Sequence, residues 1–262
     1  MIAFLRTNIP DPVAFSVFGM DIMWYGIFVG LGALLAATVA YKRAPKHEIG
    51  PDNTIDIMII SLVAGILGAR AYYVLFNWAD YSGDFMKIIN IRLGGLAIHG
   101  GLIAGFLTCL LLCRLKGARP LDAFDLFAPC IALGQSIGRW GNYFNSEAHG
   151  GPTELPWGIP VDGHMVHPTF LYESLWCFII FCILIFMDNR RGFEGQTFLL
   201  YGMLYSLERF FVESLRTDSL MLGIFKQAQV ISAVTLTGCI IAMVILGKNS
   251  RNRGRIFFGR RV

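Results

Sequence analysis

Seven stretches of this chain are each long and apolar enough to cross a lipid bilayer as a helix, which takes about 20 residues. Backbone polar groups inside a bilayer must be satisfied within the segment, so such stretches fold as helices. Of the 262 residues, 55% are hydrophobic and only 15% are charged. We therefore predict an all-α polytopic membrane protein with seven transmembrane helices, at about 22–41, 55–77, 95–115, 121–141, 169–187, 196–214 and 227–247.

The distribution of Lys and Arg predicts the orientation of these helices. The first, third and fifth connections and the C-terminal tail carry most of the 22 Lys and Arg residues. Because cytoplasmic segments are enriched in these residues, we expect the N-terminus outside and the C-terminus in the cytoplasm. The predicted organisation is a single seven-helix domain, residues 1–247, with an outer loop at about 145–168. A basic cytoplasmic tail, residues 248–262, follows it.

Three arginines, Arg70, Arg139 and Arg209, lie inside apolar stretches. A charged side chain at membrane depth costs about 3 kcal/mol or more, so it normally faces a protein interior, a partner or a ligand. With the predicted orientation, all three lie in the outer half of the membrane. They indicate a site for an anionic group at the outer leaflet, for which a phospholipid headgroup is the obvious candidate.

Other polar residues fall at the same predicted depth. The sixth stretch carries Tyr201, Tyr205, Arg209 and Glu213 four residues apart, with Arg216 three further on, so they share one helix face. Glu213 either holds the bundle together through an ion pair with Arg209 or orients Arg209 for a phosphate, and both interpretations stay open. Tyr25, His99 and Asn142 are expected near the outer surface, and Glu173 is a further candidate. Asp56 and Asp125, near cytoplasmic ends, are expected to reach interfacial water.

Several other kinds of site are not expected. No Cys and His residues have the spacing of a metal site, and neither a metal nor a nucleic-acid partner is predicted. Residues 134–138, GQSIG, match the GxSxG nucleophile elbow of serine hydrolases. That motif needs a strand–turn–helix context, whereas here it lies within a predicted membrane helix.

The strongest resemblance to a known family lies at the end of the fourth stretch. Residues 138–147, GRWGNYFNSE, followed by Gly150, resemble the signature G-R-x-G-N-F-x-N-x-E-x-x-G of the prolipoprotein diacylglyceryl transferases, with Tyr143 where Phe is usual. Shorter matches to the same family are Trp24-Tyr25-Gly26 (with Met23 where Arg is common), His99-Gly100-Gly101, residues 167–173 (HPTFLYE, with Phe170 in place of Gln), and Arg209, Glu213 and Arg216.

The resemblance implies an enzyme of the bacterial cytoplasmic (inner) membrane whose active site faces the outer leaflet. Its reaction would be the first step of lipoprotein maturation. The diacylglyceryl group of phosphatidylglycerol is transferred to the lipobox cysteine thiol of a preprolipoprotein, which forms a thioether and releases glycerol phosphate. The implied partners are membrane lipid and the signal peptide that carries the lipobox. The family needs no metal or organic cofactor.

The resemblance also implies roles for individual residues. Arg139 and Arg209 would bind the donor phosphate, which suits the planar fork of guanidinium. His99 would accept the thiol proton or only orient the substrate, and both roles stay open. The expected catalytic residues are thus His99, Arg139 and Arg209. The expected substrate-binding residues are Tyr25, Arg139, Asn142, Asn145, Glu147, Gly150, Tyr205 and Glu213.

Two other functions compete with the transferase. A membrane transporter or channel also uses intramembrane Arg/Glu clusters, but it would be favoured by polar residues at both membrane depths and by two similar halves, and neither is evident. An intramembrane protease needs a catalytic dyad, and Ser136 has no evident base partner.

Overall fold

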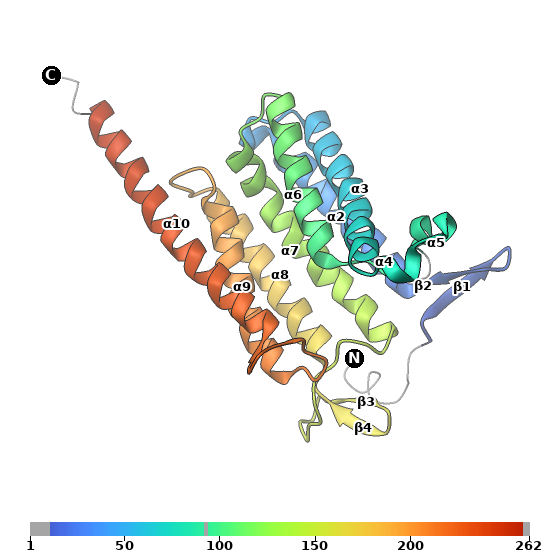
Figure 1. The fold of residues 1–262 in the computed structure, drawn as a ribbon. Helices are drawn as coiled ribbons and strands as arrows, with labels where there is room; N and C mark the ends of the chain where they lie inside the picture. Colours follow the sequence, from blue (N-terminus) through green and yellow to red (C-terminus); the bar gives the residue numbers. More distant parts are fainter. Residues whose placement is uncertain (1–10, 92–93, 259–262) are drawn as a thin grey trace. The chain divides into compact units, whose positions relative to one another are not determined.

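The computed structural model describes residues 11–91 and 94–258, with side chains described as far as residue 250. Most of this part of the chain is helical (Figure 1). In this part of the chain, seven long helices overlap the seven predicted ranges and agree with them to within about four residues at each end, except at the C-terminal end of the last: α2 (Trp24–Arg43), α3 (Pro51–Phe76), α6 (Ile98–Leu115), α7 (Pro120–Phe144), α8 (Thr169–Asp188), α9 (Gln196–Leu215) and α10 (Gln227–Phe258). Three short helical segments lie in the connections: η1 (Ala44–His47), α4 (Trp78–Tyr81) and α5 (Phe85–Ile89).

Five of the long helices are long and apolar enough to cross a membrane. The other two, α7 and α9, carry more polar residues, among them Arg139 and Arg209. The structure is therefore that of a helical membrane protein, while the crossing of all seven helices and their orientation stay predictions. Helix α10 continues to Phe258, so the predicted boundary at 247 is not a helix end, and residues 259–262 of the predicted tail lie outside the described residues.

Three short hairpins depart from the purely helical prediction. They are β1 (Val13–Val17) with β2 (Met20–Met23), β3 (Ile159–Val161) with β4 (His164–Val166), and β5 (Met221–Leu222) with β6 (Phe225–Lys226). Asp162 and Gly163, which join β3 to β4, both have positive φ, at 48° and 78°. An Asp-Gly pair in this conformation is the turn that two-residue hairpins prefer. The hairpin therefore follows from turn chemistry within the predicted outer loop.

The chain divides into two compact units, Met1–Thr38 with Phe124–Val262, and Val39–Ala123. In the unit Val39–Ala123, α3 packs against α6 through small residues. A Cβ atom added to Gly68 would lie 2.3 Å from Ala104 Cβ and 2.8 Å from the Gly100 carbonyl oxygen. Glycine is therefore what lets the two backbones approach, as it does in other membrane helix pairs.

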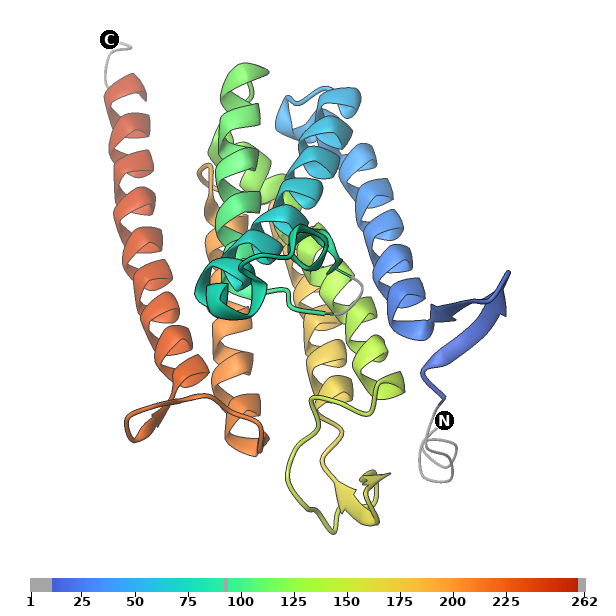
Figure 2. The same cartoon turned by 45° about the vertical axis from the view of Figure 1, so that its right-hand side comes forward.

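In the other unit, polar contacts fix α7, α8 and α9. Ser136 Oγ donates to the Ser174 carbonyl, and Ser174 Oγ donates to the Ser136 carbonyl, both at 2.8 Å. The Ser136 hydroxyl thus joins α7 to α8, and Ser136 lies within a helix and not in the strand–turn–helix context that the hydrolase motif needs. Figure 2 shows β3–β4 beyond the ends of α7 and α8, and α9 beside α10.

The environment of Asp125, in α7, differs from the predicted contact with interfacial water. Asp125 is fully buried and does not reach water. Its carboxylate accepts hydrogen bonds from the Gly195 and Phe198 amides, each at 2.8 Å, and from Arg191 at 3.1 Å. It therefore satisfies amides at the start of α9, which lacks a side-chain cap of its own. Asp56 differs, since 56% of its side chain is exposed and its carboxylate pairs with Lys116 at 2.7 Å, and its contact with interfacial water stays a prediction.

Candidate active site

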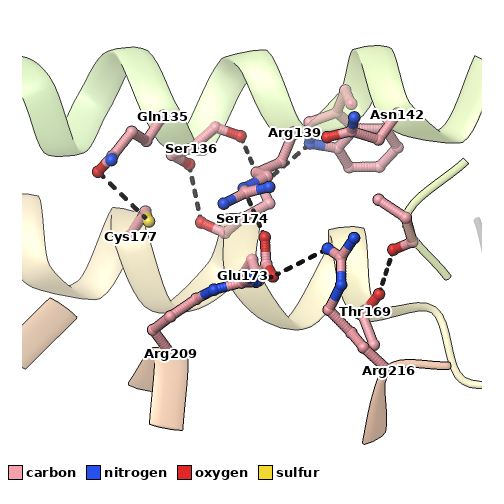
Figure 3. Close-up of polar contacts among 12 residues, drawn as sticks. Gln135, Ser136, Arg139, Asn142, Thr169, Glu173, Ser174, Cys177, Arg209 and Arg216 are labelled. Atoms are coloured by element: carbon pink, nitrogen blue, oxygen red, sulfur yellow. Dashed lines mark hydrogen bonds and ion pairs between the residues drawn. The ribbon is translucent and has the colours of Figure 1, made fainter. Parts of the chain in front are cut away.

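A single carboxylate joins the arginines of α7 and α9. Glu173, on α8, is 1% exposed. Its Oε2 lies 2.5 Å from Arg139 Nε, and its Oε1 lies 2.9 Å from Arg209 Nη1. Arg216 Nη1 is 3.8 Å from the same Oε1. Figure 3 shows the three guanidinium groups turned toward this carboxylate. We call these four residues, together with Glu213, the arginine cluster.

The predicted polar face of α9 is confirmed. Arg209 Nη2 lies 2.6 Å from Glu213 Oε2, so the internal ion pair exists, and Glu213 is 2% exposed. Tyr201 Oη donates to Gln135 Oε1 on α7 at 2.9 Å, and the Tyr201 and Tyr205 rings stack with centroids 5.8 Å apart. The stripe therefore faces α7 and α8.

Part of the Arg139 guanidinium group is left unused by its contact with Glu173. Glu173 occupies its Nε, and within residues 11–91 and 94–258 no hydrogen bond or ion pair engages its two Nη groups. The side chains of Arg139 and Arg209 are each 22% exposed, so they are accessible although their shared carboxylate is buried. Two parallel N–H groups of one guanidinium match the oxygens of a phosphate. This arrangement can hold an anion.

The segment after α7 brings together three predicted site residues. Asn142 and Asn145 both donate through Nδ2 to Glu147 Oε1, at 3.0 and 3.2 Å. Ser146, between them in this tight turn, has a φ of 53°. Glu147 therefore sets the positions of both amides, that of Asn142 about one helical turn beyond Arg139 and that of Asn145 just after the end of α7.

Gly150 connects the loop between α7 and α8 to the end of α9. Its amide donates to the His167 carbonyl at 2.9 Å, and it forms a β-bridge with Arg216. A Cβ atom here would lie 2.7 Å from His167 Cβ and 3.0 Å from the Leu215 carbonyl oxygen. A larger residue does not fit without displacing Arg216 or the loop.

Tyr25 lies against α7 beside the signature residues. A Cβ atom at Gly141 would lie 2.5 Å from Tyr25 Cδ2, so this glycine makes room for the ring. The preceding residue, Trp24, stacks on Phe144 with ring centroids 5.0 Å apart. The start of α2 is thereby fixed beside the end of α7.

Arg70 has a different environment from Arg139 and Arg209. It is buried, and its guanidinium donates to four main-chain carbonyls, those of Lys87, Ile88, Gly94 and Gly95, at 2.5 to 3.0 Å. Its Cζ also lies 5.0 Å from the centroid of the Tyr81 ring. Arg70 thus holds the segment before α6, and the expectation of an anion site does not extend to it.

His99 is exposed at the start of α6, with its ring 6.5 Å from that of Tyr72. It belongs to the unit Val39–Ala123, so its relation to Arg139 stays a prediction. Glu173 was a weaker candidate from the sequence than its position deserves. The signal in the sequence is its place near the predicted outer end of an apolar stretch, at the predicted depth of Arg139 and Arg209.

Comparison with known proteins gives concordant matches. The family model for prolipoprotein diacylglyceryl transferase matches residues 12–245. A phosphatidylglycerol–prolipoprotein diacylglyceryl transferase of Finegoldia magna is 52% identical over 233 residues, which cover 88% of this chain and 94% of the relative. Proteins of the same name from Clostridioides difficile and Clostridium novyi are 50% and 46% identical. Those matches cover 92% and 93% of this chain and 98% of each relative.

Proposed function

Because this chain belongs to the prolipoprotein diacylglyceryl transferase family, we propose that it transfers the diacylglyceryl group of phosphatidylglycerol to the lipobox cysteine of a preprolipoprotein. The cysteine thiolate attacks the glyceryl carbon that bears the phosphate, and a C–S bond forms as the C–O bond breaks. The electron pair leaves on the phosphate oxygen, so the products are a thioether and glycerol phosphate. Family membership favours this reaction over transport or conduction.

The convergence of Arg139 and Arg209 on Glu173 is the observation that carries this proposal. Two guanidinium groups at one place can neutralise the phosphodiester when it binds. The same groups then stabilise the charge that develops on the departing phosphate oxygen. Glu213 and Glu173 hold Arg209 in position, and the free Nη groups of Arg139 supply the fork.

The remaining site residues have supporting roles. His99 takes the proton of the thiol, because the thiolate is the nucleophile and a free thiol has a pKa of about 8.5. Tyr25, Tyr205 and Gly150 shape the surroundings of the donor. Asn142 and Asn145, fixed by Glu147, present amides at the outer end of α7.

The membrane arrangement is part of the same proposal. All seven long helices cross the inner membrane as one domain, with the N-terminus outside, the C-terminal tail in the cytoplasm and the site toward the outer leaflet. α7 and α9 cross despite their polar residues, because those residues face α8 and each other. The reaction uses neither a metal nor an organic cofactor.

Purified protein in detergent, phosphatidylglycerol and a lipobox peptide test the reaction. We expect glycerol phosphate release and a gain in peptide mass by one diacylglyceryl group. Both should vanish with a Cys-to-Ser peptide and with Arg139→Ala. Well-folded protein that releases no glycerol phosphate would overturn the proposal.

A further inference from the structure

Glu208 is a buried acid that the arginine cluster does not use. It lies on α9 directly before Arg209 and is 5% exposed. Both of its carboxyl oxygens are buried and neither has a hydrogen-bond partner among the described residues. Glu173 and Glu213 are buried to the same degree, yet each is paired with arginine. Because buried polar groups are normally paired, this exception needs an explanation.

The groups around Glu208 do not neutralise it. Its electrostatic neighbours are Glu173 and Cys177 on α8, Arg139 on α7 and Arg209 on α9 itself. No ion pair joins Glu208 to Arg139 or Arg209 within the described part of the chain, where Glu173 binds both arginines and Glu213 binds Arg209. α10, which packs along α9, has no charged residue between Gln227 and Lys248.

This environment favours the uncharged form of the carboxyl group. A buried carboxylate without a partner costs far more free energy than a buried neutral acid. The negative charge of Glu173 on the facing helix adds to that cost. We propose that Glu208 carries a proton in the resting enzyme and is a positioning residue that leaves the arginine cluster with a net charge of one positive.

The net charge of the arginine cluster links the protonation of Glu208 to donor binding, and this step rests on the proposed function. Three arginines are paired with two buried glutamates, Glu173 and Glu213. Asp218, whose side chain is 53% exposed, also pairs with Arg216, and Lys226 Nζ donates to the Glu213 and Arg216 carbonyls at 2.7 Å, so these two opposite charges at the rim offset each other. One net positive charge matches the single negative charge of a phosphodiester. An ionised Glu208 would cancel it before the donor arrives.

Infrared difference spectroscopy tests the protonation directly. The protein is measured at neutral pH in a detergent without ester groups, because lipid esters absorb where a protonated carboxyl group does. The difference spectrum of wild type minus Glu208→Gln should show the carbonyl band of a protonated acid. Wild type minus Glu154→Gln, a matched change in the exposed outer loop, should not. A Glu208 difference that shows only carboxylate bands would overturn the proposal.

The pH dependence of donor binding tests the role. Phosphatidylglycerol binding without peptide should weaken by roughly tenfold or more as rising pH ionises Glu208. It should not do so in Glu208→Gln or in Glu208→Leu, which replaces the acid by an apolar side chain of similar size. The same pH dependence in all three proteins would overturn the role of Glu208 alone. A wild type that binds no phosphatidylglycerol at any pH would instead count against the proposed function.

Discussion

Arg139 and Glu173 form an ion pair between neighbouring helices, with Arg139 Nε 2.5 Å from a carboxylate oxygen that is almost completely buried. The pair uses the Nε edge of the guanidinium and leaves both Nη groups to another partner. Glu173 thereby orients Arg139 without consuming the donors that a phosphate needs. Arg209 is bound by the other oxygen of the same carboxylate.

The geometry of the guanidinium, beyond its charge, is expected to matter at Arg139. Arg139→Lys keeps the charge but presents a point cation that cannot donate two parallel hydrogen bonds. We expect kcat/KM for phosphatidylglycerol to fall by about 100-fold, the usual cost of losing one stabilising donor of a developing oxyanion. Lys42→Arg, in the last turn of α2, is the matched control and should behave as wild type. Activity near that of wild type in Arg139→Lys would argue against a two-pronged contact.

Glu173 is expected to be important for both stability and activity. Glu173→Gln removes a charge that three arginines share, and breaking a buried pair from one side typically costs about 3–5 kcal/mol. We expect a lower melting temperature and a loss of transfer that high phosphatidylglycerol concentrations do not restore. Glu154→Gln, which removes an exposed carboxylate of the loop between α7 and α8, should change neither. A Glu173→Gln protein with normal melting and normal transfer would mean that the arginines are held by other contacts.

The elements of the site that could be predicted are those that depend on local spacing. The four-residue repeat of Tyr201, Tyr205 and Arg209 predicts one helix face, and that face does point to α7 and α8. The central place of Glu173 is different, because it depends on which two helices flank α8. No single-helix pattern contains that information.

The partners of Arg70 also could not be predicted from the sequence. An arginine within an apolar stretch indicates a partner but not its kind. Its partners are two carbonyls within the short helix α5 and two in the segment that follows it, which the chain brings back to α3. Asp125 shows the same limit, because its partners are amides at the start of α9, whereas the sequence predicts contact with interfacial water.

The pH dependence of transfer distinguishes two possible roles of His99, accepting the thiol proton and positioning the substrate. If His99 takes the thiol proton, His99→Gln should be most defective near neutral pH, where a thiol with a pKa of about 8.5 is mostly protonated. The defect should shrink as pH rises above that value, because the thiolate then forms unaided. The measurement is the ratio of wild-type to variant kcat/KM from pH 6.5 to 9.5. A ratio that stays constant would assign His99 a positioning role.

Gly150 is expected to tolerate no side chain. In Gly150→Ala the new Cβ would lie 2.7 Å from His167 Cβ and 3.0 Å from the Leu215 carbonyl oxygen, both on fixed elements. Either the β-bridge to Arg216 opens or the loop moves, and both displace groups next to the arginine cluster. We expect a loss of transfer together with faster hydrogen exchange at the Gly151 amide, which donates to Leu215. Gly238→Ala, in α10 where a Cβ meets nothing within 4 Å, separates this effect from glycine replacement in general. Transfer and exchange rates that match this control would show that the bridge does not hold Arg216.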